Sequence, residues 1–383
     1  MLDIDKLGAE IRRLRKKAGI TQEELAEKLN VRFQAVSNWE RGITPPGIDN
    51  LVELSEFFGV SVDAIIKPSD EEYYIGVDAG GTKTEFVLFT ADGRVLKRLT
   101  LGSCNPHDIG MTACKNTLME GIEKITVDYP RISTAFVGLA GAGLVSVNDE
   151  INAYLKERTR ITKAIVDSDT YSIFALADAD IALLSGTGMV VLVKKDTLAL
   201  GGWGYMFDES GSGYDVGKDA LRACMFYEDG IGEPTSLHDV IKSMLYDGKV
   251  PEKDYLIRAQ TEKIYKGGKK FVASFAPIVI REYREGDKVA RDIIEKSVKH
   301  MATLLNRAIK YSGTDKVIAS GGFIVNNKEI LLPLFKKYTS AKLVFSDLPP
   351  VYGACRECLR RVNVEESVDF KENFKKTYDL IRL

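Results

Sequence analysis

Residues 73–89 read Tyr-Tyr-Ile-Gly-Val-Asp-Ala-Gly-Gly-Thr-Lys-Thr-Glu-Phe-Val-Leu-Phe. An apolar run ends at Asp78, two glycines follow, and a second extended run begins near Glu85, so the stretch predicts two strands joined by a tight hairpin. Glycine has no Cβ atom and lets backbone amides approach a phosphate, while the residues after it add donors and positive charge. The spacing of a Walker loop is absent. We expect Asp78 to hold a magnesium ion, directly or through water. The residues expected to bind phosphate are Gly80, Gly81, Thr82, Lys83 and Thr84.

Two further apolar runs also end in glycine-rich loops. These loops are Ser185-Gly186-Thr187-Gly188 and Ser320-Gly321-Gly322. Three loops of this kind predict a duplicated α/β body that binds a nucleotide in a cleft between its two halves. We expect the halves at residues 73–178 and 179–383, after a short acidic linker at residues 68–72.

The order and spacing of the three loops resemble the ribonuclease H-like fold of actin, hexokinase and the heat-shock ATPases. Within that fold, residues 73–360 resemble the family of N-acetylglucosamine kinases and BadF/BadG/BcrA/BcrD ATPases. The resemblance rests on Ser185-Gly-Thr-Gly followed, at residues 201–214, by Gly-Gly-Trp-Gly-Tyr-Met-Phe-Asp-Glu-Ser-Gly-Ser-Gly-Tyr. It implies ATP and Mg²⁺ as cofactors, an amino sugar as ligand and phosphoryl transfer to a sugar hydroxyl. Gly321 and Gly322 would then belong to the adenosine loop.

The same resemblance implies a catalytic carboxylate at the end of the strand that precedes Ser185. Asp167 and Asp169 both stand there. We prefer Asp169 as the base, because the residues after it resemble the helix that follows the family's aspartate, and we keep Asp167 in reserve. Either carboxylate also suits the N-cap of a helix. The residues expected to contact the sugar are Asn105, Gly202, Trp203, Asp208 and Glu209. The face of Trp203 is left open by flanking glycines and suits stacking on a sugar.

Two departures from the family pattern bear on the substrate. Met189 and Val190 stand where the family has small or polar residues that help to bind ligand. The acidic motif is also shifted, since it reads Phe-Asp-Glu-Ser-Gly-Ser-Gly at residues 207–213. These departures leave the identity of the sugar open and favour, slightly, a protein that senses a ligand without turning it over.

Upstream of the body, residues 7–65 have the apolar periodicity of a helical domain. Thr21 and Glu24 form a capping box at the start of a second helix, and Asn30 suits the left-handed turn before a third. The pattern resembles the Cro/phage-repressor helix-turn-helix family, whose third helix enters the major groove of DNA. The residues that the resemblance places on base edges are Arg32, Phe33, Gln34, Ser37 and Asn38. Gln22 and Arg41 would contact the DNA backbone.

One such head contacts few bases, so we expect a homodimer on a palindromic double-stranded operator. The alternative is a helical bundle that binds protein, because residues 1–67 contain ten basic and eleven acidic residues. We rank this alternative well behind DNA binding.

Composition places the chain among globular proteins of the cytoplasm. The net charge is −2, 45% of the residues are hydrophobic, and no apolar run approaches the length of a bilayer span. The N-terminus lacks the pattern of a signal peptide. The five cysteines are expected to be reduced, and the pair Cys355 and Cys358 fits one face of a helix better than a metal site.

Three functions remain open on the sequence. The first is a sugar-responsive transcriptional regulator with an active amino-sugar kinase domain. The second is a repressor whose body senses sugar or nucleotide without catalysis. The third is an activator ATPase that bridges an iron–sulfur cluster across a dimer; we rank it last, because the cysteines do not stand where that branch carries its cluster ligands.

Overall fold

The computed structural model describes residues 2–66, 72–129, 132–142, 145–208, 210–246 and 256–381. The expected linker therefore lies almost wholly outside the described residues. The chain forms two compact units, Met1–Ser172 together with Leu348–Leu383, and Ile173–Asp347. Within the described residues, every helix is too short or too polar to cross a membrane.

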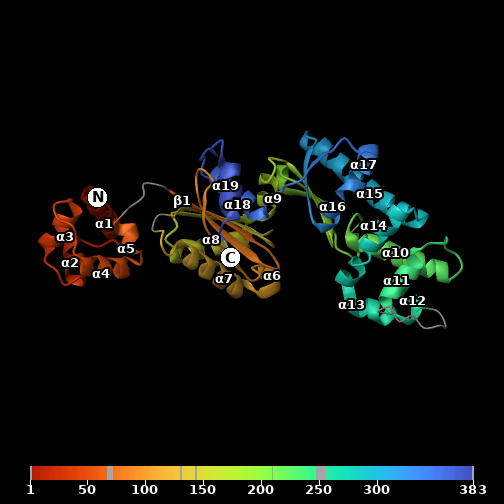
Figure 1. The fold of residues 1–383 in the computed structure, drawn as a ribbon, viewed down its shortest axis with the longest axis horizontal. Coiled ribbons are helices and arrows are strands. Elements are labelled where there is room, and N and C mark those ends of the chain that lie inside the picture. Colours follow the sequence, from red (N-terminus) through yellow and green to blue (C-terminus); the bar gives the residue numbers. More distant parts are fainter. Residues whose placement is uncertain are drawn as a thin grey trace. The chain divides into compact units, whose positions relative to one another are not determined.

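The head is built from five helices (Figure 1). They are α1 (Ile4–Lys17), α2 (Gln22–Lys28), α3 (Phe33–Glu40), α4 (Ile48–Phe58) and α5 (Val62–Ile66). Thr21 and Glu24 form the expected capping box, and Asn30 has a positive φ of 49° in the turn before α3. The apolar stripes of the helices meet in a common core that includes Leu7, Leu25 and Val36. The predicted helical head is therefore confirmed.

The first half of the body is a five-stranded mixed sheet in the order β3-β2-β1-β4-β5. The strands are β1 (Tyr73–Ala79), β2 (Thr84–Thr90), β3 (Val95–Leu101), β4 (Ile132–Leu139) and β5 (Lys163–Ser168). The first three form an antiparallel meander, whereas β4 and β5 run parallel to β1. The accompanying helices are α6 (Pro106–Ile109), α7 (Met111–Thr126), α8 (Val145–Arg158) and α9 (Thr170–Ala175).

The end of the chain returns to this first sheet. Helices α18 (Pro350–Arg360) and α19 (Phe370–Tyr378) lie on the side of the sheet opposite α7 (Figure 1). Gly76 leaves room for α18, since a Cβ atom there would lie 2.8 Å from the backbone nitrogen of Cys355. The expected second half at residues 179–383 therefore needs correction: residues 348–383 join the first unit, because they cover a sheet face that would otherwise be exposed.

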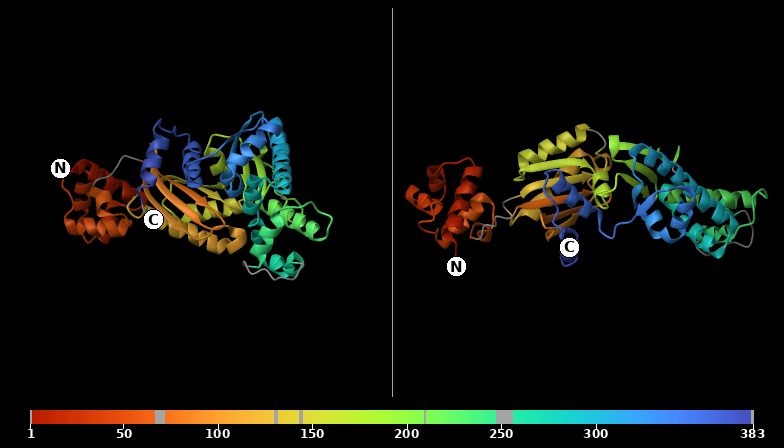
Figure 2. Two further views of the ribbon diagram at one scale, coloured as in Figure 1. Left: turned by 45° about the vertical axis from the view of Figure 1, so that its right-hand side comes forward. Right: turned by 90° about the horizontal axis from the view of Figure 1, so that it is seen from above.

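The second half, drawn in green to blue in Figure 2, repeats the topology of the first. Its strand order is β10-β9-β6-β7-β8. Its strands are β6 (Ile181–Ser185), β7 (Met189–Val193), β8 (Leu198–Gly201), β9 (Lys316–Ser320) and β10 (Lys342–Val344). Again an antiparallel meander is extended by two parallel strands. The predicted α/β body with two related halves is confirmed.

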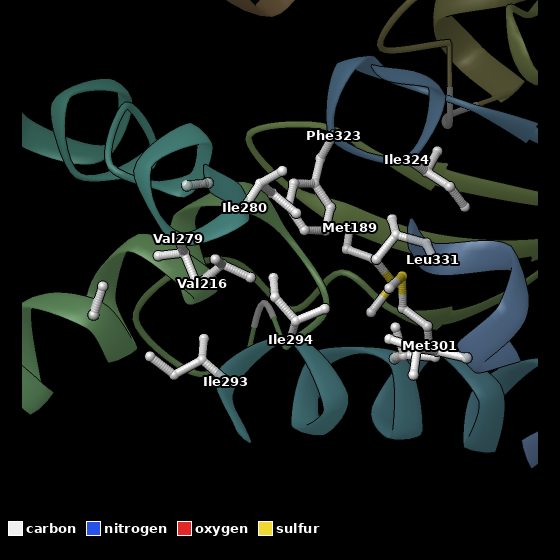
Figure 3. Packing of buried hydrophobic residues seen from close by; sticks show 14 of the residues in the cluster. Met189, Val216, Val279, Ile280, Ile293, Ile294, Met301, Phe323, Ile324 and Leu331 are labelled. Carbon is white, nitrogen blue, oxygen red and sulfur yellow. The ribbon is translucent and has the colours of Figure 1, made fainter. Parts of the chain in front are cut away.

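Helices of the second unit pack on this sheet and on one another, and they enclose a large hydrophobic core. They are α10 (Gly213–Glu228), α11 (Leu237–Leu245), α12 (Leu256–Ala259), α13 (Thr261–Ala273), α14 (Ala276–Glu285), α15 (Lys288–Ser312), α16 (Gly322–Asn326) and α17 (Lys328–Tyr338). Figure 3 shows Met189 of β7 beside Met301 of α15 in this core. The strands that lead into the glycine loops are thus anchored by buried side chains in this core.

Candidate functional site

The hairpin between β1 and β2 is held by its own backbone. The amide of Gly80 donates to the carbonyl of Lys83 at 3.0 Å, and the carbonyl of Gly80 accepts from the amide of Cys104 at 3.1 Å. Gly81, Thr82 and Lys83 are exposed. Thr84 is not: it is fully buried, and its hydroxyl donates to the carbonyl of Gly102 at 2.8 Å. The expectation that Thr84 binds phosphate is therefore wrong for this structure. Its hydroxyl instead ties the start of β2 to the residue that follows β3.

Asp78 lies near the end of β1, at the edge of the sheet where the parallel strands terminate. Burial, together with the negative charges of Asp169 and Glu85, raises the pKa of Asp78 to about 6, although the positive charge of Lys83 opposes this rise. The described residues contain no group of three or more side chains that could ligate a metal ion. Mg²⁺, however, commonly uses only one or two carboxylates beside phosphate and water. Asp78 and its surroundings therefore fit a magnesium–nucleotide site.

The two candidate bases have different surroundings. Asp167 forms an ion pair at 2.8 Å with Arg361, the residue that follows α18, and also accepts from the amide of Ser168 at 2.8 Å. Asp169 follows β5, where its amide donates to the carbonyl of Leu139 at 3.3 Å. Burial raises the pKa of the Asp169 carboxyl, and hydrogen bonds from Ser168 and the Thr170 backbone offset part of that rise. Asp167 is thus paired with a cation, whereas the hydrogen bonds to Asp169 come from a hydroxyl and the backbone.

Asn105 caps a short helix beside the hairpin. Its side-chain oxygen accepts from the amide of His107 at 3.0 Å, and its side-chain nitrogen donates to Asp108 at 2.8 Å. A Cβ atom on Gly141 would lie 2.6 Å from that oxygen, and one on Gly81 would lie 3.4 Å from Asp108. The loops after β1, β3 and β4 therefore meet at one place. His107 and Asp108 were missed by the sequence analysis, although Asn before Pro at a helix start is a recognisable cap signal.

In the second unit, three glycine-containing segments also meet: residues 185–188, residues 211–213 and residues 320–322. The Ser185 hydroxyl is buried and donates to the carbonyl of Gly211 at 2.7 Å, and the amide of Gly213 donates to the carbonyl of Gly186 at 2.7 Å. Gly321 has a φ of 102°, and a Cβ atom there would lie 2.5 Å from the carbonyl oxygen of Ser185. Ser185 therefore braces the loop and does not offer its hydroxyl to a ligand, contrary to expectation.

Around that loop, several other predicted residues occupy suitable positions for a ligand. Thr187 and Gly322 are exposed, while Gly188 is partly exposed. A Cβ atom on Gly186 would lie 3.6 Å from the amide nitrogen of Gly322, so the first loop and the start of α16 are neighbours. Because glycines have no Cβ atom, a phosphate can come close to the backbone amides of these two loops, and such amides form anion-binding surfaces.

The segment after β8 exposes aromatic side chains. Trp203 is 74% exposed, and Met206 and Phe207 beside it are largely exposed as well. Gly202 has a positive φ of 70° and packs against Val190, whereas Met189 points into the core. Met189 therefore does not replace a ligand contact.

Asp208 closes this segment. Burial raises its pKa, but hydrogen bonds from Ser210 and the charges of His300 and Lys218 outweigh burial and hold it below the ordinary value. The Asp208 carboxylate lies 3.6 Å from Nε2 of His300. Glu209 lies outside the described residues.

In the head, the start of α3 presents the predicted base-reading side chains. Arg32, Phe33 and Gln34 are exposed, and Ser37 and Asn38 are partly exposed. The Arg41 side chain donates to Asn38 at 2.8 Å.

Beneath this surface, an unpredicted buried carboxylate organises the motif. Glu40 accepts from the side-chain amide of Gln22 at 2.6 Å and from Arg15 at 2.5 Å and 3.0 Å. Gln22 is therefore oriented by α3 before any DNA is present, so the two helices are held in one arrangement.

Comparison with known proteins gives two family matches. Residues 75–355 match the BadF/BadG/BcrA/BcrD ATPase family, and residues 11–65 match a helix-turn-helix family. In the head, the chain is 39% identical over 79 residues to the HTH-type transcriptional regulator ImmR of Bacillus subtilis, covering 21% of this chain and 55% of that protein. The resemblance of the head to DNA-binding domains is confirmed.

The body is similar to amino-sugar kinases. It is 31% identical over 318 residues to the N-acetyl-D-glucosamine kinase of Dictyostelium discoideum, covering 74% of this chain and 97% of the relative. It is 28% identical over 305 residues to the N-acetylmuramic acid/N-acetylglucosamine kinase of Clostridium acetobutylicum, with the same coverages, 74% and 97%.

A solved structure supports the fold. A candidate N-acetylglucosamine kinase of Chromobacterium violaceum matches with a TM-score of 0.54 at 21% identity, covering 74% of this chain and 97% of that chain. A match at this identity supports the actin-like sugar-kinase architecture alone. With a family match that spans most of its length, the chain belongs to the BadF/BadG/BcrA/BcrD ATPase family, related to the N-acetylglucosamine kinases and preceded by a helix-turn-helix DNA-binding domain.

Proposed function

We propose that the chain is a transcriptional regulator whose ATPase domain phosphorylates an N-acetylated amino sugar. The observation that carries the catalytic part is the contrast between the two aspartates at the end of β5, Asp167 inside the strand and Asp169 directly after it. Asp167 is neutralised by Arg361, whereas the structure records a hydroxyl neighbour, Ser168, for Asp169. A base for phosphoryl transfer needs a carboxylate that is free to accept a hydroxyl proton.

In the proposed reaction, a primary hydroxyl of the sugar gives its proton to the Asp169 carboxylate. The sugar oxygen bonds to the γ-phosphorus of ATP, and the bond from that phosphorus to the bridging oxygen breaks, which releases ADP. Lys83 and the backbone amides of the glycine hairpin offset the negative charge of the phosphates. Magnesium held by Asp78 would supply further charge neutralisation at those phosphates.

The sugar specificity is proposed from partly or fully exposed groups, taken in each unit by itself. Asn105 and Asp208 offer hydrogen bonds for hydroxyl or amide groups, and Trp203 offers an aromatic face for the apolar side of a sugar ring. The relatives named as N-acetylglucosamine kinases support an N-acetylhexosamine as the substrate class.

The regulatory part of the proposal joins the two domains. The protein would bind a palindromic operator as a homodimer, and the amino sugar or its phosphate would change the affinity for DNA. A ligand has this effect only if it binds the DNA-competent and incompetent arrangements unequally. Footprints of the whole protein, recorded with and without sugar and nucleotide, test this step. An identical footprint under every ligand contradicts ligand control of DNA binding.

The most informative experiment for the catalytic part is a screen of amino sugars in an ATP-consumption assay. We expect Mg-ATP turnover with an N-acetylhexosamine and a phosphorylated sugar as the product, identified by mass spectrometry. A second candidate, a sensor without turnover, is favoured by the shifted acidic motif at residues 207–213. It predicts saturable sugar binding by calorimetry in the absence of any product.

A further inference from the structure

A buried glutamate lies next to the phosphate hairpin and has no part in the reaction proposed above. Glu85 of β2 stands directly opposite Asp78 of β1 in the sheet register. Its side chain is only 3% exposed. Removing a carboxylate from water is unfavourable unless hydrogen bonds and cations surround it. The neighbours of Glu85 therefore determine what this charge does.

The two oxygens of the Glu85 carboxylate have different partners. Oε1 accepts from Nη2 of Arg98 at 3.2 Å and from the hydroxyl of Tyr378. Oε2 faces the ammonium group of Lys83 at 3.5 Å. Because Arg98 and Tyr378 both donate to Oε1, the orientation of the carboxylate is fixed, and Oε2 lies toward the Lys83 ammonium.

Tyr378 comes from α19, close to the end of the chain. The amide of Val95 donates to the hydroxyl of Thr377 at 2.9 Å, which fixes α19 on β3. The Tyr378 ring stacks on Phe374 with centroids 5.2 Å apart, and the guanidinium of Arg98 lies 3.9 Å from its centroid. The match to the ATPase family ends at residue 355, so this helix lies beyond the part of the chain that the family describes.

We propose that Tyr378 and Glu85 are positioning residues for the phosphate hairpin: the tyrosine hydroxyl orients the buried carboxylate, which holds the Lys83 ammonium beside the site until nucleotide phosphate takes it up. The proposal rests on the nucleotide-binding role proposed for the hairpin. It gives the C-terminal helix a function in ATP affinity. Neither residue touches the sugar or the reacting atoms.

The geometry also predicts what happens without the hydroxyl. Oε1 would keep Arg98 but lose its second donor, so the carboxylate would be free to rotate away from Lys83. The long, exposed lysine side chain would then sample many rotamers, and ordering it on a phosphate would cost more conformational entropy. The effect belongs to nucleotide binding and not to the chemical step.

The test is the substitution Tyr378→Phe in the whole protein, which removes one oxygen and keeps the stacked ring. We expect the KM for ATP to rise about fivefold, with kcat and the KM for the sugar within about twofold of the original, as for a lost hydrogen bond to a charged group. Tyr311→Phe is the matched control, because Tyr311 donates to Asp196 at 2.6 Å in the second unit. A purely structural role of Tyr378 would change both KM values together.

A double-mutant cycle identifies the path of the effect. In a Lys83→Met background, Tyr378→Phe is expected to leave the KM for ATP unchanged, because the lysine through which it acts is gone. Full additivity of the two substitutions, or a Tyr378→Phe protein with an unaltered KM for ATP, overturns the inference. Failure of the original protein to bind Mg-ADP in calorimetry instead overturns the proposed function, so the two failures are distinguishable.

Discussion

The two sheets of the body share strand order and direction, yet their strand ends carry different chemistry. In the first sheet, β1 carries Asp78 near its end and β5 leads into Asp169. In the second, β6 ends at Ser185, whose hydroxyl is consumed by a backbone carbonyl, and the loops around it offer glycine backbone. The strand ends of the first sheet therefore present carboxylates, whereas those of the second sheet present glycine backbone. A shared topology fixes where a site lies, and the residues at the strand ends decide what it does.

The largest expected effect tests the charged half. Asp169→Asn keeps the shape of the side chain but removes the proton acceptor, so kcat should fall about 10²–10⁴-fold in the ATP-consumption assay. Asp167→Asn is the matched control. It weakens the partly exposed ion pair with Arg361, which takes no part in the proposed reaction, and is expected to change kcat less than about threefold. A large loss in Asp167→Asn with near-normal turnover in Asp169→Asn would reverse the assignment of the base.

The second effect contrasts equivalent glycines after the central parallel strands. In Gly321→Ala, the new Cβ atom would meet the backbone of Ser185 at 2.5 Å while φ is 102°, and the expected loss in the free energy of unfolding is about 2–4 kcal/mol. In Gly141→Ala, φ is 83° but the Cβ atom would meet the side chains of Asn105 and His107, which can move. A smaller loss of about 1–2 kcal/mol is expected there. Urea unfolding measures both, and equal losses would contradict the contrast.

The loops themselves could be predicted from the sequence, because an apolar run followed by glycines is a local signal. The roles of Thr84 and Ser185 could not. Each hydroxyl looks like a phosphate ligand in the sequence, but its partner, Gly102 or Gly211, comes from a distant part of the chain. The sequence position of such a partner carries no periodic signal that identifies it.

Long-range packing explains the other differences. The C-terminal helices were assigned to the second half because they follow it in sequence, yet α18 covers the first sheet through the close approach of Cys355 to Gly76. The contact between Glu85 and Tyr378 spans 293 positions. Asn105, by contrast, stands in a local motif, and the structure shows it as the cap of α6. A short motif of this kind singles out one residue of a loop and leaves its neighbours, His107 and Asp108, unnamed.

The third effect concerns the aromatic segment of the second half. Trp203→Ala should raise the KM for the sugar about tenfold through loss of ring stacking. It should change the free energy of unfolding by less than about 0.5 kcal/mol, because the side chain is 74% exposed. The chain has two tryptophans, so Trp39→Phe leaves Trp203 as the fluorophore. Sugar should then alter the emission of the Trp39→Phe protein, and a spectrum unaffected by saturating sugar would remove Trp203 from the site.

The smallest expected effect is a pH-dependent change in stability that distinguishes charge from shape. Burial raises the pKa of Asp169 in the folded protein, so near the ordinary aspartate pKa of about 4 and below, both folded and unfolded chains carry the proton and no penalty exists. As pH rises toward the folded pKa, the unfolded chain releases its proton first and stability falls.

Asp169→Asn should therefore be more stable than the original at neutral pH without magnesium, and this advantage should disappear in acid. Ser185→Ala, which removes a neutral hydrogen bond in the second half, should be destabilised equally at both pH values. If Asp169→Asn raised the free energy of unfolding by the same amount at both pH values, the gain would come from packing. The difference in charge between the two halves would then have no effect on stability.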